Sequence, residues 1–367
     1  MPRTQAGPAL LKGHASADAT RSLRKRFAKS RAENFYRTLA NGLVVSSLGL
    51  GTYLGECDDE EDARYTVAAA AAMERGVNLL DTAINYRCQR SERALGKAIE
   101  KSVNSGRIKR EQVVVCSKGG YIPLDKKPPA TKDEYRSFLQ EEYFLRGVMD
   151  PADVIAGGHC LTGQFLEDQI ERSRRNLGLE TIDVYYLHNP EQALDVFPRQ
   201  KFLTVVRDAF AILERAVENG SIGCYGCATW NGFRVPPESK NHLSLEELVS
   251  LAHEAGGAGH HFRVIQLPIN LAMTEAVRAE TQCVGRDRVT PLEAAHRLGI
   301  SVIASATLMQ SQLTHGLPEQ VHSAFPGFSS DARRAIAFTQ SLPLSAALVG
   351  MESLWHLEEN LAAPSLS

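Results

Sequence analysis

The chain has 367 residues, which is long enough for one large α/β domain or for two ordinary ones. Its 41 Lys and Arg residues nearly balance 43 Asp and Glu residues, and the formal net charge of -2 gives no support for a nucleic acid or an anionic membrane as partner. No apolar run reaches membrane length, and the seven cysteines are scattered and odd in number, so we expect a soluble protein of the reducing cytoplasm.

The first 35 residues differ from the remainder in charge. Residues 21–37 contain seven Lys or Arg residues and a single acid, Glu33. We interpret residues 1–35 as a basic, flexible extension. An organelle presequence is the alternative, because the segment is rich in Arg and poor in acids, whereas no apolar stretch of a secretory signal follows Met1.

Residues 36–367 are expected to form one domain, which opens with a β-hairpin around Asn41-Gly42, because Asn and Gly accept the positive φ of a tight turn. Eight segments then have the length and the β-branched or aromatic content of buried strands. These segments are Leu48–Thr52, Val77–Asp81, Val113–Lys118, Ile182–His188, Ile222–Ala228, Val264–Leu267, Ser301–Ser305 and Ala346–Val349. Helical periodicity lies between them, most clearly over Asp62–Arg75, Ser91–Ser102, Phe165–Leu177, Phe202–Asn219, Leu245–Ala255, Pro291–Leu298, Asp331–Ser341 and Leu354–Leu361.

Eight alternating strand–helix units without a central break predict an α/β fold of the (β/α)8 TIM-barrel type. An open doubly wound sheet is the alternative, and it would carry a Gly-x-Gly-x-x-Gly turn that opens a helix. The nearest candidate, Gly49-Leu50-Gly51-Thr52, lacks the third glycine and lies within a strand, so we do not interpret it as a phosphate cradle. A long insertion after the third strand, from Gly119 to Leu161, is rich in Pro, Gly and aromatic residues and is interpreted as a lid over the active face.

Three successive strands of this series end on side chains that can hold or transfer a proton. Asp81 ends the second strand and is followed by Tyr86, Lys118 ends the third, and His188 ends the fourth. The carboxyl ends of parallel strands lie at one end of a barrel, so these four side chains are expected in one crevice. Each alone has a simpler explanation, such as a cap or a solvated lysine, but together they favour a proton-relay site and hence an enzyme.

Other constellations are weaker. Cys224 and Cys227 lie three residues apart in a strand, so their side chains are expected on opposite faces and not in a metal or redox pair. His253, His260 and His261 surround a Gly-rich turn and match no ligand spacing. We therefore expect no metal site.

The segment Asp81-Thr82-Ala83-Ile84-Asn85-Tyr86, followed by Ser91-Glu92-Arg93-Ala94-Leu95-Gly96, resembles the signature of the aldo-keto reductase family. Further similarities follow in the family's order from about Tyr36 to Leu361. They are Leu48-Gly49-Leu50-Gly51-Thr52, Lys118, His188 in Leu-His-Asn-Pro, Val264-Ile265-Gln266-Leu267-Pro268-Ile269-Asn270 and Leu357-Glu358-Glu359-Asn360. The resemblance implies a (β/α)8 barrel that binds a nicotinamide cofactor without a Rossmann motif.

The resemblance also implies roles for the four residues: Tyr86 as general acid and base, Lys118 as the group that tunes its pKa, Asp81 as the partner of Lys118, and His188 as the residue that orients the substrate. The chemistry is consistent with these roles. Hydride reduction leaves negative charge on the carbonyl oxygen, so a proton donor is needed nearby. Tyrosine, with a free pKa near 10, is a poor acid unless a cation lies beside it.

Cofactor contacts are implied in the same way. The expected residues are Gly51, Thr52, Asp81, Thr229, Gln266, Ser305, Glu359 and Asn360. Ser305 stands where the family usually has a tyrosine that stacks on the nicotinamide, and Ala228 and Thr229 replace its usual Ser-Asn pair. The cations that grip a 2′-phosphate are missing from Gly350–His356, which offers Glu352 instead, so we expect NAD or NADP with NAD slightly favoured.

The expected function is that of an NAD(P)-dependent oxidoreductase acting on a small carbonyl or alcohol substrate, either an aldehyde, a ketone or a sugar. Two alternatives remain open. The family includes cofactor-sensing regulatory subunits with slow chemistry, which the loss of the stacking tyrosine would suit. A lysine at a barrel strand end is also typical of Schiff-base aldolases, in which Lys118 would be the nucleophile. The oligomeric state is left open.

Overall fold

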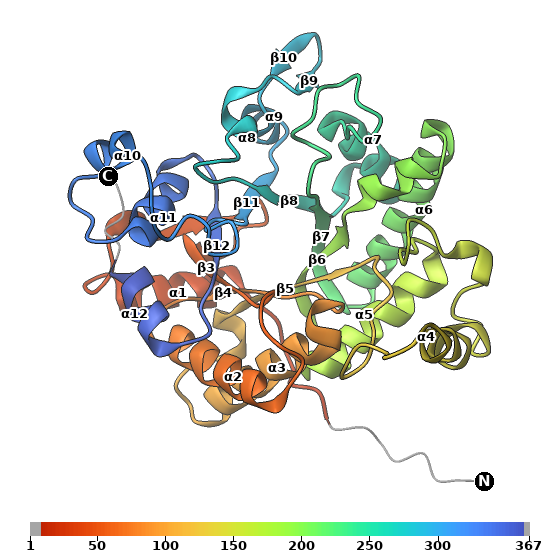
Figure 1. Ribbon diagram of the computed structural model, residues 1–367, viewed down its shortest axis with the longest axis horizontal. Coiled ribbons are helices and arrows are strands. Elements are labelled where there is room, and N and C mark those ends of the chain that lie inside the picture. Colours follow the sequence, from red (N-terminus) through yellow and green to blue (C-terminus); the bar gives the residue numbers. More distant parts are fainter. Residues whose placement is uncertain (1–8, 363–367) are drawn as a thin grey trace.

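The computed structural model describes residues 9–362, in which eight parallel strands close into a barrel surrounded by helices (Figure 1). The strands are β3 (Leu48–Gly51), β4 (Leu79–Asp81), β5 (Val114–Gly119), β6 (Ile182–His188), β7 (Ile222–Ala228), β8 (Phe262–Pro268), β11 (Ser301–Ser305) and β12 (Ala346–Gly350). They follow one another around the barrel in chain order, and β12 pairs with β3 to close it. The predicted barrel is confirmed, and the open sheet is excluded.

The outer helices occupy the segments in which helical periodicity was found. They are α2 (Asp59–Glu74), α3 (Arg90–Asn104), α5 (Gly163–Leu177), α6 (Arg199–Glu218), α7 (Leu245–Gly256), α9 (Pro291–Arg297), α11 (Asp331–Ser341) and α12 (Leu354–Leu361). Local chemistry explains several starts: the side chains of Asp58, Ser244 and Thr290 accept a hydrogen bond from the backbone three residues on.

The hydrophobic core has two layers because side chains alternate across each strand. In β6, Val184 and Tyr186 belong to the cluster inside the barrel, whereas Tyr185 and Leu187 belong to the cluster between strands and helices. Cys224 and Cys227 of β7 are likewise divided between the two clusters. The two thiols therefore face opposite sides of the sheet.

The amino-terminal segment is part of the folded structure from residue 9, which corrects the expected flexible extension; residues 1–8 lie outside the described part. Helix α1 (Ala17–Phe27) buries Leu23 completely and exposes its basic residues to solvent. The Ala15 amide donates to Asp183 at 2.6 Å. The basic residues of this segment concealed the apolar contact of Leu23, which belongs to the large core cluster.

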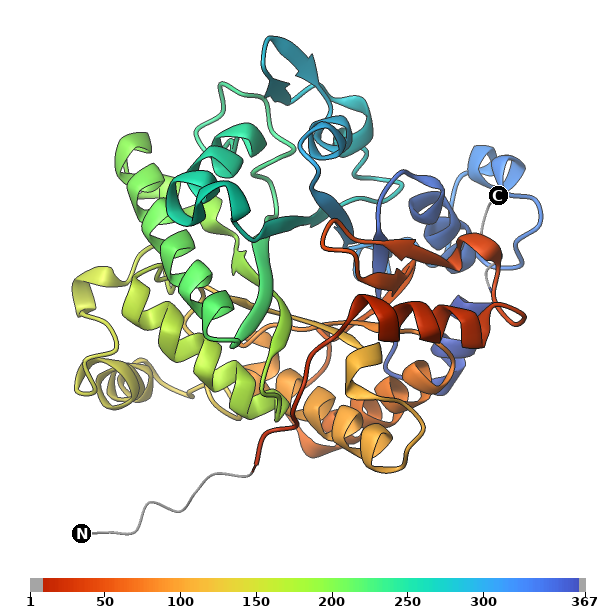
Figure 2. The ribbon, with the colours of Figure 1, turned by 180° about the vertical axis from the view of Figure 1, so that it is seen from behind.

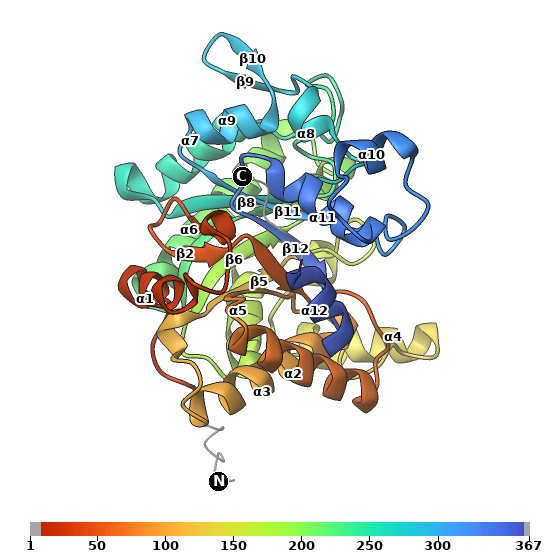
Figure 3. The ribbon, with the colours of Figure 1, turned by 90° about the vertical axis from the view of Figure 1, so that its left-hand side faces the viewer.

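A two-stranded antiparallel sheet, β1 (Tyr36–Thr38) with β2 (Val44–Ser46), follows α1, and Gly42 between them has a φ of 85°. Figure 2 shows α1 and this sheet in red across one end of the barrel. Seen from the side, they lie opposite the end that carries helix α4 (Lys132–Leu139) (Figure 3). The amino-terminal segment thus covers the end of the barrel away from the strand termini that hold the candidate catalytic residues.

The insertion between β5 and α5 has its own helices, namely α4, the π-helical turn η4 (Gln140–Phe144) and the 3-10 turn η5 (Pro151–Asp153). A small apolar cluster joins Leu139 and Tyr143 of this segment to Phe165 of α5. The described chain also contains a second hairpin, formed by β9 (Gln282–Val284) and β10 (Asp287–Val289), and two short helices, α8 (Glu275–Arg278) and α10 (Glu319–Ala324).

Candidate active site

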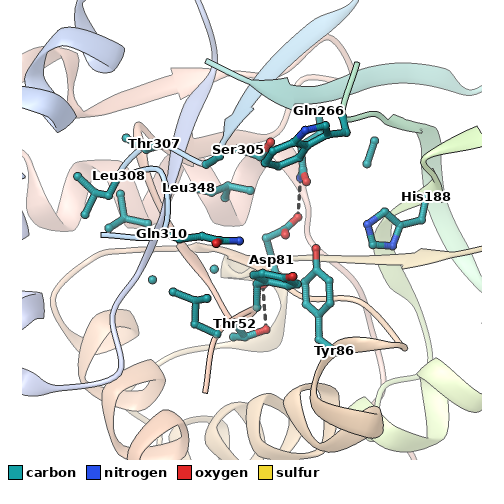
Figure 4. A pocket seen from close by; sticks show the side chains of 18 of the residues that line it. Thr52, Asp81, Tyr86, His188, Gln266, Ser305, Thr307, Leu308, Gln310 and Leu348 are labelled. Atoms are coloured by element: carbon teal, nitrogen blue, oxygen red, sulfur yellow. Dashed lines mark hydrogen bonds between the residues drawn. The ribbon is translucent and has the colours of Figure 1, made fainter. Parts of the chain in front are cut away.

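Three side chains from successive strands and one from the turn after β4 meet at the carboxyl end of the barrel. Asp81 ends β4, His188 ends β6, and Lys118 lies one residue before the end of β5. Tyr86 opens the short turn η2 (Tyr86–Gln89) that follows β4. Asp81, Tyr86 and His188 line one cavity of about 450 Å³ (Figure 4), with Lys118 directly behind Asp81. The structure therefore brings the four predicted residues together.

Lys118 and Asp81 form a buried ion pair, with Nζ and Oδ1 2.5 Å apart. The ammonium also donates to the Thr82 carbonyl at 2.8 Å, and the Gln266 amide donates to the second oxygen of Asp81 at 2.7 Å. Burial lowers the pKa of Lys118, but the charge of Asp81, the charge of Tyr86 and the hydrogen bond to Asp81 together outweigh it, and the net pKa is raised. Lys118 is therefore an ammonium that hydrogen bonds hold in place.

Tyr86 lies beside this ammonium. The Lys118 Nζ atom is 4.9 Å from the centroid of the tyrosine ring. Burial raises the pKa of Tyr86, and the positive charge of Lys118 opposes that shift. The phenol is consequently protonated at neutral pH, while the ammonium stabilises the tyrosinate that proton donation would leave.

His188 faces Tyr86 across the cavity, with ring centroids 5.7 Å apart. Burial lowers the pKa of His188 well below its usual value, and the charge of Lys118 adds to the effect. The ring is therefore neutral and carries a single N–H. The backbone carbonyl of His188 accepts a hydrogen bond from Nε2 of the buried His159 at 2.7 Å, and this bond fixes the end of β6. A neutral imidazole here can donate to a substrate oxygen without competing with Tyr86 for the proton.

Six of the eight expected cofactor residues line this cavity. They are Gly51, Thr52, Asp81, Thr229, Gln266 and Ser305. Gln266 is anchored through its amide nitrogen to Asp81, so its Oε1 atom is left as an acceptor. The Thr229 hydroxyl is buried and has no hydrogen-bond partner within residues 9–362. An unpaired buried hydroxyl beside a free amide oxygen fits the carboxamide of a nicotinamide ring.

Glu359 and Asn360 are the two expected cofactor residues outside the cavity lining. Both belong to α12, and Asn360 is 4% exposed. Near the start of this helix, the charge of Glu352 acts on Arg64 of α2. A hydrogen bond with Glu61 raises the pKa of Arg64, and Glu352 adds to the shift. Arg64 comes from a helix almost 300 residues before Glu352 in the chain, and sequence reasoning missed this charge interaction.

Sequence reasoning also missed the aromatic wall of the cavity. Tyr53, Tyr121 and Trp230 each follow the end of a barrel strand within two residues and line the cavity with Tyr86. The Tyr121 ring lies 4.9 Å from the ring of His188. Aromatic residues immediately after strand ends were the available signal. Tyr121 is the contribution of the long insertion to this wall, and its other aromatic residues pack against α5.

The loop after β11 closes the remaining side of the cavity. Thr307, Leu308 and Gln310 line it, as Figure 4 shows. Ala306 and the run from Met309 to Ser311 have positive φ angles, so the loop is tightly turned.

Over residues 9–362 we find no group of three His, Cys, Asp or Glu side chains that could hold a metal ion, and none of the described helices is long and apolar enough to span a membrane.

The family model for the aldo/keto reductase family matches residues 47–235, which include all four of the residues that meet around the cavity. The chain belongs to the aldo/keto reductase family. This family membership agrees with the closed barrel and with the resemblance of the motif around Asp81 and Tyr86.

Curated relatives in the family match about half of this chain and about half of their own length. D-threo-aldose 1-dehydrogenase from a Pseudomonas species is 28% identical over 195 residues, 51% of each chain. The NADH-specific methylglyoxal reductase of Escherichia coli is 26% identical over 191 residues, 51% of this chain and 49% of its own. An aldo/keto reductase from Klebsiella pneumoniae, solved in complex with NADP and acetate, covers 91% of both chains with a TM-score of 0.59 and 18% identity, and so shares the fold.

Proposed function

We propose that this aldo/keto reductase family member is an NAD(P)-dependent oxidoreductase that interconverts a small carbonyl compound and the corresponding alcohol. The observation that carries the proposal is the buried Lys118–Asp81 pair beside Tyr86, opposite a neutral His188 in one cavity. A nicotinamide bound against Thr229 and Gln266 would supply or accept the hydride. The chain's own residues would then manage the proton and the charge on the substrate oxygen.

In the reduction direction, the substrate carbonyl oxygen lies between Tyr86 and His188. The N–H of His188 donates to this oxygen and holds it in position, and its contribution grows as negative charge develops there. Tyr86 transfers its proton to the oxygen, and the adjacent ammonium of Lys118 stabilises the tyrosinate that remains. Asp81 keeps Lys118 at this place and balances its charge.

The same geometry disfavours the Schiff-base aldolase. A lysine that attacks a carbonyl must reach the substrate as a neutral amine. Lys118 is 0% exposed, its ammonium is held by Asp81 and the Thr82 carbonyl, and its pKa is raised. A lysine in this position stabilises the tyrosinate form of Tyr86 and does not act as a nucleophile.

The proposal is tested with Tyr86→Phe and the matched variant Tyr121→Phe, because both phenols line the cavity and only Tyr86 lies beside Lys118. Reduction of a panel of aldehydes, ketones and sugars is measured with NADH and NADPH, and cofactor binding is followed by protein fluorescence. We expect Tyr86→Phe to lose about a hundredfold or more in turnover with cofactor binding unchanged. Near-normal turnover in Tyr86→Phe, or an equal loss in both variants, would contradict the assignment of Tyr86 as the proton donor.

A further inference from the structure

Two cysteines far apart in the sequence lie in contact beside the candidate active site. The sulfur of Cys57 is 3.7 Å from that of Cys88, and we call these residues the thiol pair. Cys57 lies in the segment between β3 and α2, the same segment that contributes Tyr53 and Leu54 to the cavity wall. Cys88 lies in η2, two residues after Tyr86.

Arg87 fixes the backbone on both sides of the thiol pair. Its guanidinium donates to the carbonyl of Glu56 at 2.7 Å and to that of Asp58 at 3.4 Å, the two neighbours of Cys57. The same side chain is 1% exposed and forms an ion pair with Asp62. The two sulfurs therefore meet because one buried arginine, adjacent to Cys88 in sequence, holds the Cys57 segment.

The turn that carries Cys88 has an unusual backbone. Arg87, Cys88 and Gln89 have φ angles of 47°, 55° and 68°, three consecutive non-glycine residues in the left-handed region. Such a conformation persists only where surrounding contacts enforce it. The amide of Lys126 donates to the Cys88 carbonyl at 3.0 Å, and the Gln89 side chain donates to the Leu124 carbonyl at 3.0 Å. A new covalent bond at Cys88 would act on this strained turn directly after Tyr86.

We propose that the thiol pair is an oxidative modification site, in which a hydroperoxide converts Cys57 and Cys88 to a disulfide that lowers turnover at the adjacent site. The proposal rests on the proposed oxidoreductase function for its effect on turnover, but not for formation of the bond. A disulfide needs a sulfur separation of about 2.05 Å, so the two atoms must approach by about 1.7 Å. That approach pulls the Cys57 segment and the Tyr86 turn together.

The chemistry balances as a two-electron oxidation. Cys57 is the partly exposed thiol, and as a thiolate it attacks the peroxide oxygen to give a sulfenic acid while the O–O bond breaks and releases the alcohol or water. The buried Cys88 sulfur then attacks the sulfenic sulfur, forms the S–S bond and releases water. A peroxide reaches the partly exposed Cys57 before the buried Cys88, whose pKa burial raises to about 12.

Formation of the bond is tested on the intact chain by mass spectrometry. The reduced protein is treated with hydrogen peroxide, alkylated and digested with trypsin without reduction, which places Cys57 in residues 38–64 and Cys88 in residues 88–90. We expect these two fragments joined and lighter by two hydrogens. Recovery of the two fragments separately, both oxidised or both alkylated, would overturn the proposal.

The effect on turnover is measured on the same samples. We expect kcat/KM to fall about tenfold or more on oxidation and to return with dithiothreitol, since a displacement of about 1 Å in an active site can cost about a hundredfold. Cys57→Ser should keep its basal activity and lose the response, whereas Cys283→Ser, which removes an exposed thiol outside the pair, should respond like the wild type. A cross-link without a change in kcat/KM, or a response that persists in Cys57→Ser, would refute the control of turnover.

The two proposals fail in different ways. Absence of turnover in the fully reduced protein would contradict the proposed function. Mass spectrometry of the joined fragments would still show whether the disulfide forms. The effect of the disulfide would then be measured as a change in NADPH affinity by protein fluorescence. An unchanged affinity in the cross-linked protein would overturn the regulatory proposal.

Discussion

Replacement of Lys118 by Met removes the positive charge beside Tyr86 while keeping a side chain of similar length. The charge lies 4.9 Å from the ring centroid, and at an effective dielectric constant of about 20 this separation corresponds to about 3 kcal/mol of stabilisation of the tyrosinate. At about 1.4 kcal/mol for each tenfold change, the tyrosinate population should fall about a hundredfold. Alcohol oxidation, which needs Tyr86 as a base, should lose that factor in rate.

The pH dependence of the oxidation rate follows from the direction of the pKa shift of Tyr86. Burial raises the pKa of Tyr86 above its ordinary value, so the tyrosinate is a minor species at neutral pH and its population increases as the pH rises. The rate of alcohol oxidation should therefore rise from about pH 6 to about pH 9 in the wild type and in Lys118→Met. At each pH the rate of Lys118→Met should be lower by about two orders of magnitude. Reduction, for which Tyr86 is already protonated, should show a flat profile in the same range.

A loss of folding stability must be separated from the loss of oxidation rate, because Lys118→Met leaves Asp81 as a buried charge without its partner. Breaking a buried pair in this way costs about 3–5 kcal/mol of stability. The matched variant Asp81→Asn/Lys118→Met removes both charges, so it should recover much of the stability in urea unfolding. Its oxidation rate should stay well below that of the wild type, because the cation beside Tyr86 is still absent, although removal of the Asp81 charge, which raises the pKa of Tyr86, returns a part of the rate. A wild-type oxidation rate in the double variant, or a pH–rate profile of Lys118→Met that coincides with that of the wild type, would refute the role of Lys118.

Two further predictions concern the cofactor and the long insertion. Glu352→Lys should increase NADPH affinity about tenfold and leave NADH affinity unchanged, because it removes an acid and adds a charge-assisted bond to the 2′-phosphate. Equilibrium titration of both cofactors measures the two affinities. A clear preference of the wild type for NADP would contradict the expectation that NAD binds at least as tightly. Replacing residues 125–158 with a short Gly/Ser loop should raise KM and alter the substrate range while the barrel still unfolds cooperatively, although the loss of Leu139 and Tyr143 from the cluster around Phe165 lowers its stability. Loss of cooperative unfolding would show that the insertion belongs to the core.

The cofactor prediction depends on the charged side chains around Glu352. Arg64 lies near Glu352, but it already forms ion pairs with Glu60, at 3.1 Å, and with Glu61. A 2′-phosphate would have to compete with Glu60 and Glu61 for the hydrogen-bond donors of Arg64, which is why the titration is expected to favour NAD or to find the two cofactors equal.

The strand–helix alternation and the four candidate catalytic residues could be predicted from local patterns in the sequence. All eight barrel strands lie within a few residues of their predicted bounds, because buried β-branched runs and the capping residues before helices are local signals. Asp81, Lys118 and His188 could be placed together because parallel strands in a barrel all end on one side. Once the fold class is known, strand ends alone predict this juxtaposition.

Tertiary structure decided the contacts between segments distant in the chain. Gln266 reaches Asp81 across 185 residues, Cys57 meets Cys88 through Arg87, and Glu352 lies near Arg64. Helix α1 packs against β2 although its sequence is dominated by charge. No local periodicity encodes such pairs: they exist because closing the barrel brings particular loops and helix faces together, and the free energy of each contact depends on a partner that the neighbouring sequence does not contain.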